Sequence, residues 1–202
     1  MSEETIEQVE QLTPEAAAES LHTQWMQAGM ARNKHAVEQD RRRASLEEQL
    51  RLAIRENDRD LYEATREKLA VLDDSRANQV WYSEWETLNK SANRLENELS
   101  IALDVYRDKL FALTKEISRV YRERALGGLL AMCGGDVVAA EKLANHLGIQ
   151  NKGEILHGLL ISNRALKLDR QFPELQKLRD AIVAEAVKLE LSVDEPVSQV
   201  AD

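Results

Sequence analysis

The chain has 202 residues, of which 31% are charged and 4% aromatic, and its formal net charge is −9. This acidic balance argues against a protein that binds nucleic acid along its whole length, because such binding depends on Lys and Arg side chains that neutralise phosphates. The single cysteine, Cys133, excludes a disulfide within the chain, and a free thiol is typical of a reducing compartment.

The N-terminal part of the sequence predicts a tail followed by long helices. Residues 1–12 carry four Glu and no Lys or Arg, which indicates a flexible acidic tail and not a signal peptide. Thr13-Pro14 is a typical helix start, because the hydroxyl caps the first turn and proline suits the first helical position. Gly29 is the only glycine before residue 127, so long helices should fill this region. No uncharged stretch is long enough to cross a membrane, and we expect a cytoplasmic protein.

Three places in the first long region carry residues that end or begin helices. These are Gly29 with Asn33, then Asn57-Asp58, and then Asp73-Asp74-Ser75. The basic run Arg41-Arg42-Arg43 lies among acidic residues, so it indicates a solvated helix face.

From Trp81 onward, apolar residues follow a heptad spacing. Steps of four and three alternate over almost four heptads, along Trp81, Trp85, Leu88, Ala92, Leu95, Leu99, Ala102 and Tyr106. Such a seam predicts a coiled coil or an antiparallel helical hairpin, and we assign four of its residues to an oligomer seam: Leu88, Leu95, Leu99 and Tyr106. Residues 36–72 repeat only loosely, so we favour a second chain as the partner of the seam; pairing within the chain stays open.

The composition changes at Gly127-Gly128, where we expect the long helix to end and a small helical domain, residues 127–191, to begin. Gly134-Gly135 indicates a helix stop and Asp136 the cap of the next helix. Phe172-Pro173-Glu174 predicts the start of the last helix. Residues 192–202 are expected to form a second flexible tail.

Residues 140–160 resemble a helix-turn-helix. The resemblance rests on the segment Leu143-Ala144-Asn145-His146-Leu147-Gly148-Ile149, in which a small alanine precedes the turn glycine by four residues. In a DNA-binding protein, the exposed side of the second helix would present Asn151, Lys152, Glu154 and His157. We favour the other interpretation, a helical hairpin that packs against the long helices, because the segment offers one Lys and no Arg for phosphates or bases.

Trp81, Tyr82 and Trp85 form an aromatic cluster at helical spacing. Trp81 and Trp85 lie on the heptad seam, where core packing is the usual role of such residues. Tyr82 falls off the seam, so we consider the three residues a candidate binding surface for a protein partner.

The sequence therefore predicts an all-α protein: a long antiparallel helical hairpin or coiled coil, residues 13–126, followed by a small C-terminal helical domain. No nucleophile elbow or phosphate loop is present, and Glu154-x-x-His157 has no second copy, so we expect no enzyme, cofactor or metal site. Our functional hypothesis is a non-enzymatic, oligomerising interaction protein (an adaptor, assembly factor or regulator) that binds a protein partner. The alternative is a DNA-binding regulator with a coiled-coil dimerisation region and a C-terminal helix-turn-helix.

Overall fold

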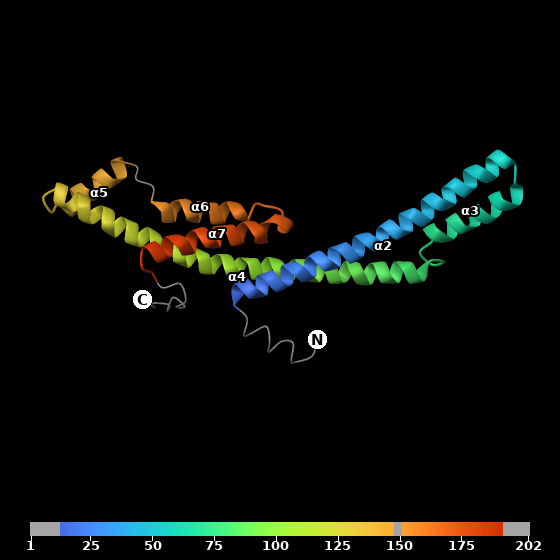
Figure 1. Ribbon diagram of the computed structural model, residues 1–202, viewed down its shortest axis with the longest axis horizontal. Coiled ribbons are helices and arrows are strands. Elements are labelled where there is room, and N and C mark those ends of the chain that lie inside the picture. Colours follow the sequence, from blue (N-terminus) through green and yellow to red (C-terminus); the bar gives the residue numbers. More distant parts are fainter. Residues whose placement is uncertain (1–12, 148–150, 192–202) are drawn as a thin grey trace. The chain divides into compact units, whose positions relative to one another are not determined.

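The computed structural model describes residues 13–147 and 151–191, and this part of the chain folds into six helices without a strand (Figure 1). The helices are α2 (Pro14–Glu56), α3 (Arg59–Asp73), α4 (Gln79–Met132), α5 (Val137–His146), α6 (Lys152–Asn163) and α7 (Leu168–Lys188). The all-α prediction, with long helices and a smaller C-terminal helical part, is confirmed. The two predicted tails lie outside the described residues.

The helix caps form where the sequence predicts them. The hydroxyl of Thr13 accepts a hydrogen bond from the Ala16 amide at 3.3 Å. The carboxylate of Asp58 accepts one from the Leu61 amide at 3.0 Å, and Asp136 accepts from the first amides of α5. Each cap satisfies a backbone donor that would otherwise have no partner within the helix, so these bonds define the helix starts.

Predicted helix boundaries are wrong at three places. Gly29 does not interrupt α2, and Gly127-Gly128 does not end α4, which continues to Met132. A glycine inside a helix costs only about 0.5–1 kcal/mol, which packing of neighbours such as the buried Leu129 offsets. The chain leaves the helical conformation at Gly134 and Gly135, where φ is 62° and 89°.

The third correction concerns α7. This helix begins at Leu168, so Pro173 lies inside it and not at its start. Proline has no N–H to donate, which leaves the carbonyl of Asp169 without its helical partner. Asp169 is exposed, so water can serve that carbonyl and the helix continues through Pro173.

Two compact units make up the chain, one of residues 20–99 and one of residues 100–202 with 1–19. This division differs from the expected 13–126 and 127–191, because the contacts of α4 change partner near residue 100 while the helix itself continues.

The unit of residues 20–99 is built from antiparallel helices. His35 on α2 lies 3.2 Å from the carbonyl oxygen of Trp81 on α4, and Arg32 donates to Asn89 at 3.3 Å. Along the same α2, Gln39 donates to the carbonyl of Leu72 on α3 at 3.3 Å. A tight turn at Asn57, where φ is 55°, joins α2 to α3.

In the other unit, α6 and α7 run beside α4 (Figure 1). Its core is a set of buried apolar side chains from all three helices: Leu110, Ile117, Leu160, Leu175 and Ile182. Gly153 on α6 lies so close to α4 that a Cβ atom there would sit 2.6 Å from the Ser118 nitrogen and 2.8 Å from the Thr114 oxygen. Glycine at this position allows α6 to pack against the α4 backbone.

Arg107 on α4 is the largest fully buried side chain, with 2% of its surface exposed. It donates to Asp104 at 2.5 Å, to Asn163 at 3.0 Å and to Gln171 at 2.6 Å. Burial lowers the pKa of its guanidinium, while Asp104 opposes that shift. The network ties α4 to the end of α6 and to α7, because its acceptors lie on all three elements.

The heptad seam on α4 is covered within a single chain. Leu95 is 7% exposed, Leu99 0% and Tyr106 2%, and Leu88 is partly buried. Side chains that one chain already buries offer no apolar surface to a second chain. Contacts within one chain thus account for the burial of Leu95, Leu99 and Tyr106, and the assignment of Leu88, Leu95, Leu99 and Tyr106 to an oligomer seam stays a prediction.

Candidate partner-binding groove

The residues proposed for DNA contact lie against the protein itself. Asn151 is buried at the start of α6, where its side-chain oxygen accepts from the Glu154 amide at 2.9 Å and from the Ser118 hydroxyl at 3.1 Å. Lys152 forms an ion pair with Glu185 on α7 at 3.2 Å. These contacts hold the first turn of α6 in place.

The other two candidate DNA contacts are also engaged. Glu154 pairs with Arg122 on α4 at 2.5 Å, and His157 lies 3.2 Å from the Thr114 hydroxyl. The His157 ring also packs against Phe111, with ring centroids 4.7 Å apart. All four residues connect α6 to its neighbours, and the turn of the expected helix-turn-helix at 148–150 lies outside the described residues.

Glu185, the partner of Lys152, lies in a small cluster of polar side chains. Its buried carboxylate accepts hydrogen bonds from Tyr121, Lys152 and Lys188. The bond from Tyr121, followed by those from the two lysines, lowers the pKa of Glu185, while burial opposes the shift. The cluster fixes α7 against α4 and α6, which is a structural role.

The aromatic cluster connects α2 to α4. Trp81 stacks on His35 with ring centroids 4.9 Å apart, and on Trp85 with centroids 5.8 Å apart. Tyr82 meets Trp81 edge-on at 5.0 Å, and its hydroxyl lies 3.5 Å from the carbonyl oxygen of Asp73. Trp81, Tyr82 and Trp85 are all partly buried. Tyr82 therefore packs within the cluster, although its sequence position is off the seam.

Truncating Trp81 and Tyr82 is expected to destabilise the protein to different degrees. Trp81→Ala removes two stacked contacts and should cost about 2–4 kcal/mol, whereas Tyr82→Ala removes one edge contact and should cost about 1 kcal/mol. Urea denaturation followed by circular dichroism measures both. Equal losses would show that Tyr82 is as important to folding as the tryptophan on which it packs.

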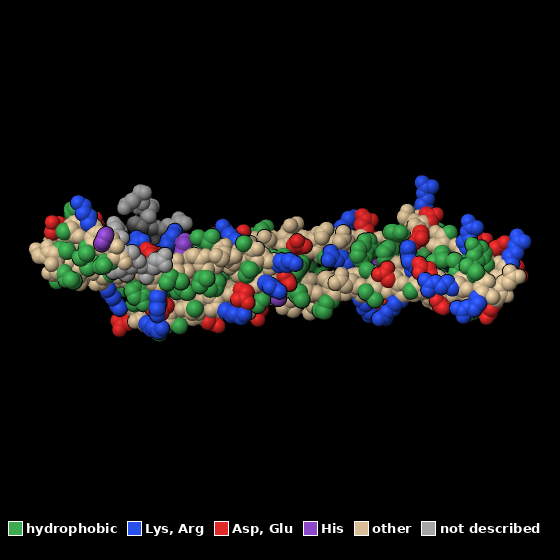
Figure 2. All heavy atoms as spheres, turned by 90° about the horizontal axis from the view of Figure 1, so that it is seen from above, with side chains coloured by type: hydrophobic (Ala, Val, Ile, Leu, Met, Phe, Trp, Pro, Cys, Tyr) green, Lys and Arg blue, Asp and Glu red, His purple; other side chains and the backbone are tan. Residues whose placement is uncertain are grey.

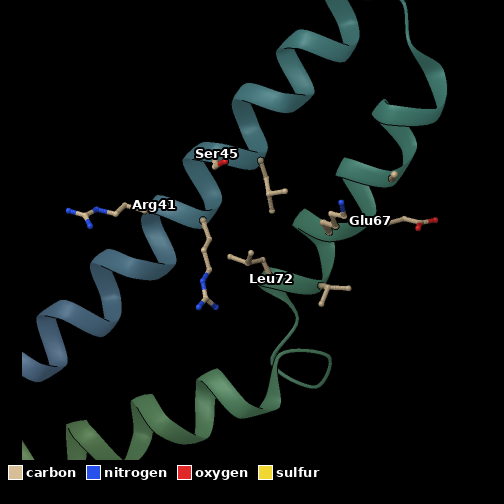
Figure 3. Close-up of a pocket in the computed structure, with 9 residues that line it drawn as sticks. Arg41, Ser45, Glu67 and Leu72 are labelled. Atoms are coloured by element: carbon tan, nitrogen blue, oxygen red, sulfur yellow. The ribbon is translucent and has the colours of Figure 1, made fainter.

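A groove of about 830 Å³ lies between α2 and α3 (Figure 3). Helix α2 lines it with Arg41, Arg42, Ser45 and Leu46, and α3 lines it with Ala64, Glu67, Lys68, Val71 and Leu72. Towards the right-hand end of the view, where α2 and α3 lie, hydrophobic side chains are interspersed with charged side chains of both signs (Figure 2). The groove is open to solvent, and all the residues that line it lie between Arg41 and Leu72 in the sequence.

Apolar residues form the walls of the groove and charged residues its rim. Leu72 points into the space between the two helices, whereas Arg41 and Glu67 point outward on opposite sides (Figure 3). Leu46 is partly buried and Val71 is 49% exposed. Exposed apolar groups at helical spacing are the usual anchors of helix recognition, so the groove is the best candidate for partner binding.

Three basic side chains that line the groove have no ion pair in the described part of the chain. Among the described residues, Arg41, Arg42 and Lys68 have no ion pair, although Arg43 pairs with Asp73 and Arg51 with Glu48. In a chain of net charge −9, the groove lining carries three cations and one acidic residue, Glu67, so the lining itself is net basic.

Sequence reasoning missed this groove because it considered the two helices separately. Ala64, Lys68 and Val71 recur at the i, i+4, i+7 spacing of one helix face, which is the signal that marks the α3 side. The basic run Arg41-Arg42-Arg43 is exposed, as expected of a solvated helix face, and Arg43 pairs with Asp73 on α3.

The described part of the chain holds neither a cluster of metal ligands nor a membrane-spanning helix. No three His, Cys, Asp or Glu side chains there lie close enough together to hold a metal ion. None of the helices within residues 13–147 and 151–191 is both long and apolar enough to cross a membrane. No protein-family model, curated protein or solved structure matches this chain, so the geometry of the groove alone carries the functional interpretation.

Proposed function

We propose that the protein is a non-enzymatic helical interaction protein, acting as an adaptor, assembly factor or regulator, and that it binds a protein partner in the α2–α3 groove. The observation that carries this proposal is the groove itself, with apolar walls and cations that lack partners among the described residues. Burial of apolar surface is the main favourable term in protein association, and each buried methylene contributes about 0.8 kcal/mol.

The groove needs neither self-association through the heptad seam nor DNA binding through α6. Self-association through the heptad seam is omitted, because Leu99 and Tyr106 are buried within one chain. DNA binding through α6 receives no support, because Asn151 and Lys152 already bond to Ser118 and Glu185. Neither feature is needed for a groove on another part of the chain to bind a partner.

Crosslinking from inside the groove tests the proposal. A photoreactive phenylalanine analogue replaces Val71, which is 49% exposed and lines the groove, and is illuminated in nuclease-treated lysate. The matched control carries the same analogue at Ile54, which is 63% exposed on α2 but does not line the groove. We expect a discrete protein adduct with the analogue at position 71 and none at position 54.

Other outcomes of the crosslinking experiment would contradict the proposal. The same adducts from both positions would indicate general surface stickiness, and no adduct from position 71 would remove the groove as a partner site. A nucleic-acid adduct that appears only without nuclease would favour the DNA-binding alternative.

A further inference from the structure

We infer that the groove binds an acidic amphipathic helix, up to about four turns long, from the partner protein. The inference rests on the proposed function and specifies the chemistry of the bound segment. Three observations lead to it: the two walls are helices, the lining combines small and branched apolar residues, and the rim is basic.

The shape of the groove favours a helix over an extended peptide. An extended strand binds by pairing its backbone with the free edge of a sheet, and the described chain contains no strand. Both walls are helices, whose backbone groups already bond within the helix, so a partner gains only side-chain contacts. A third helix packed between two antiparallel helices satisfies its own backbone and presents a continuous apolar stripe.

The length of α3 limits the length of the bound segment. The helix has 15 residues, which at about 1.5 Å per residue span roughly 22 Å. The lining residues recur along it from Ala64 to Leu72 with the spacing of one helix face. A partner helix with apolar residues at i, i+3 or i+4, and i+7 matches this face, and the length of α3 limits it to about four turns.

Small and large residues alternate in the lining. Ser45 and Ala64 are small and leave room for bulky side chains of the partner. Leu46, Val71 and Leu72 supply the branched apolar groups that would surround those side chains. This arrangement suits leucine-like anchors on the partner helix.

The charges around the groove favour a partner helix that carries Asp or Glu beside its apolar stripe. Three basic residues, Arg41, Arg42 and Lys68, line the groove without an ion pair among the described residues, against one acidic residue, Glu67. Arg41 and Glu67 both point outward (Figure 3), so Arg42 and Lys68 are the cations nearest the apolar lining. Asp or Glu beside the apolar stripe of the partner would pair with these cations, whereas Lys or Arg would be repelled.

Two synthetic peptides test the charge assignment. Both have 16 residues and the same leucine stripe, with Glu at every flanking position in one and Lys in the other, and each carries a fluorophore for anisotropy titration against the full chain. We expect the Glu peptide to bind at least tenfold more tightly at low salt, and to lose that preference as salt screens the charges. The net charge of −9 would by itself attract the Lys peptide, so tighter binding of the Glu peptide must come from the local basic rim.

A matched pair of variants assigns the preference to the groove. Arg41→Glu with Arg42→Glu should raise the Kd of the Glu peptide about tenfold, since two exposed ion pairs are each worth up to about 1 kcal/mol. Arg51→Glu with Arg55→Glu changes the same charge on the same helix outside the groove and should change the Kd less than about twofold.

The peptide results and the crosslinking results separate the two claims. Equal binding of both peptides, or equal effects of the two double variants, would overturn the acidic-helix inference. If Val71 still gives its protein adduct in that case, the proposed function stands with a partner of different chemistry. Loss of the adduct at Val71 would overturn the proposed function itself.

Discussion

Replacing Arg107 by leucine is expected to lower the free energy of unfolding by about 3–5 kcal/mol, the usual cost of removing one partner from a buried charged network. The side chain is 2% exposed and donates to Asp104, Asn163 and Gln171. Leucine fills part of the space but cannot donate a hydrogen bond. The side-chain oxygens of Asn163 and Gln171 then lose their donor in a region that water reaches poorly.

The matched control for Arg107 is Arg119, on the exposed side of the same helix. Arg119 pairs with Glu116 at 2.9 Å and Glu123 at 2.7 Å, so Arg119→Leu breaks two ion pairs in solvent and should cost less than about 1 kcal/mol. Guanidinium chloride denaturation of both variants measures the difference. Similar losses for the two would show that the Arg107 network contributes no more than a surface ion pair.

Replacing Gly153 by alanine is expected to destabilise the protein by about 1–3 kcal/mol, the range for forcing extra atoms into a packed interface. The added Cβ would lie 2.6 Å from the Ser118 nitrogen and 2.8 Å from the Thr114 oxygen, and would also meet the Ser118 hydroxyl. The Ser118 nitrogen and the Thr114 oxygen are backbone atoms, so they cannot move away by a change of rotamer as a side chain can. Helix α6 must therefore move away from α4, which weakens the Asn151 and Lys152 contacts as well.

A glycine-to-alanine change at Gly158, on the same helix, is a control with the opposite expected effect on stability. A Cβ atom at Gly158 would meet nothing within 4 Å, and the position is exposed. Gly158→Ala should therefore stabilise the protein by about 0.5–1 kcal/mol, because alanine loses less conformational freedom in a helix. Thermal melts of the two variants should shift in opposite directions; shifts of the same sign would contradict the close packing of α6 on α4.

Features that depend on neighbouring residues could be predicted from the sequence. Asp58 and Asp136 cap helices through bonds to amides two or three residues away, so the residue type alone indicates the helix start. The end of α4 follows in the same way, because Gly134 and Gly135 adopt positive φ values that other residues rarely adopt.

Features that depend on distant residues could not be predicted in this way. Gly127-Gly128 resembles a helix end locally, but packing of residues such as Leu129 extends α4 past it. Lys152 and His157 look like exposed polar residues of a DNA-reading helix, and only the positions of Glu185 and Thr114 show that they contact α7 and α4. Predicting the groove requires knowing which residues of α2 face which residues of α3. The loose apolar pattern of residues 36–72 does not specify that register.

The short turn between α2 and α3 has a consequence for the kinetics of folding. Only Asn57 and Asp58 separate the two helices, so bringing them together closes a very small loop and loses little chain entropy. Contacts between residues close in sequence form faster than those between distant ones, and loops of about ten residues close in roughly 10–100 ns. We therefore expect the walls of the groove to meet early, before the pairing of Arg107 on α4 with Gln171 on α7, which lie 64 residues apart.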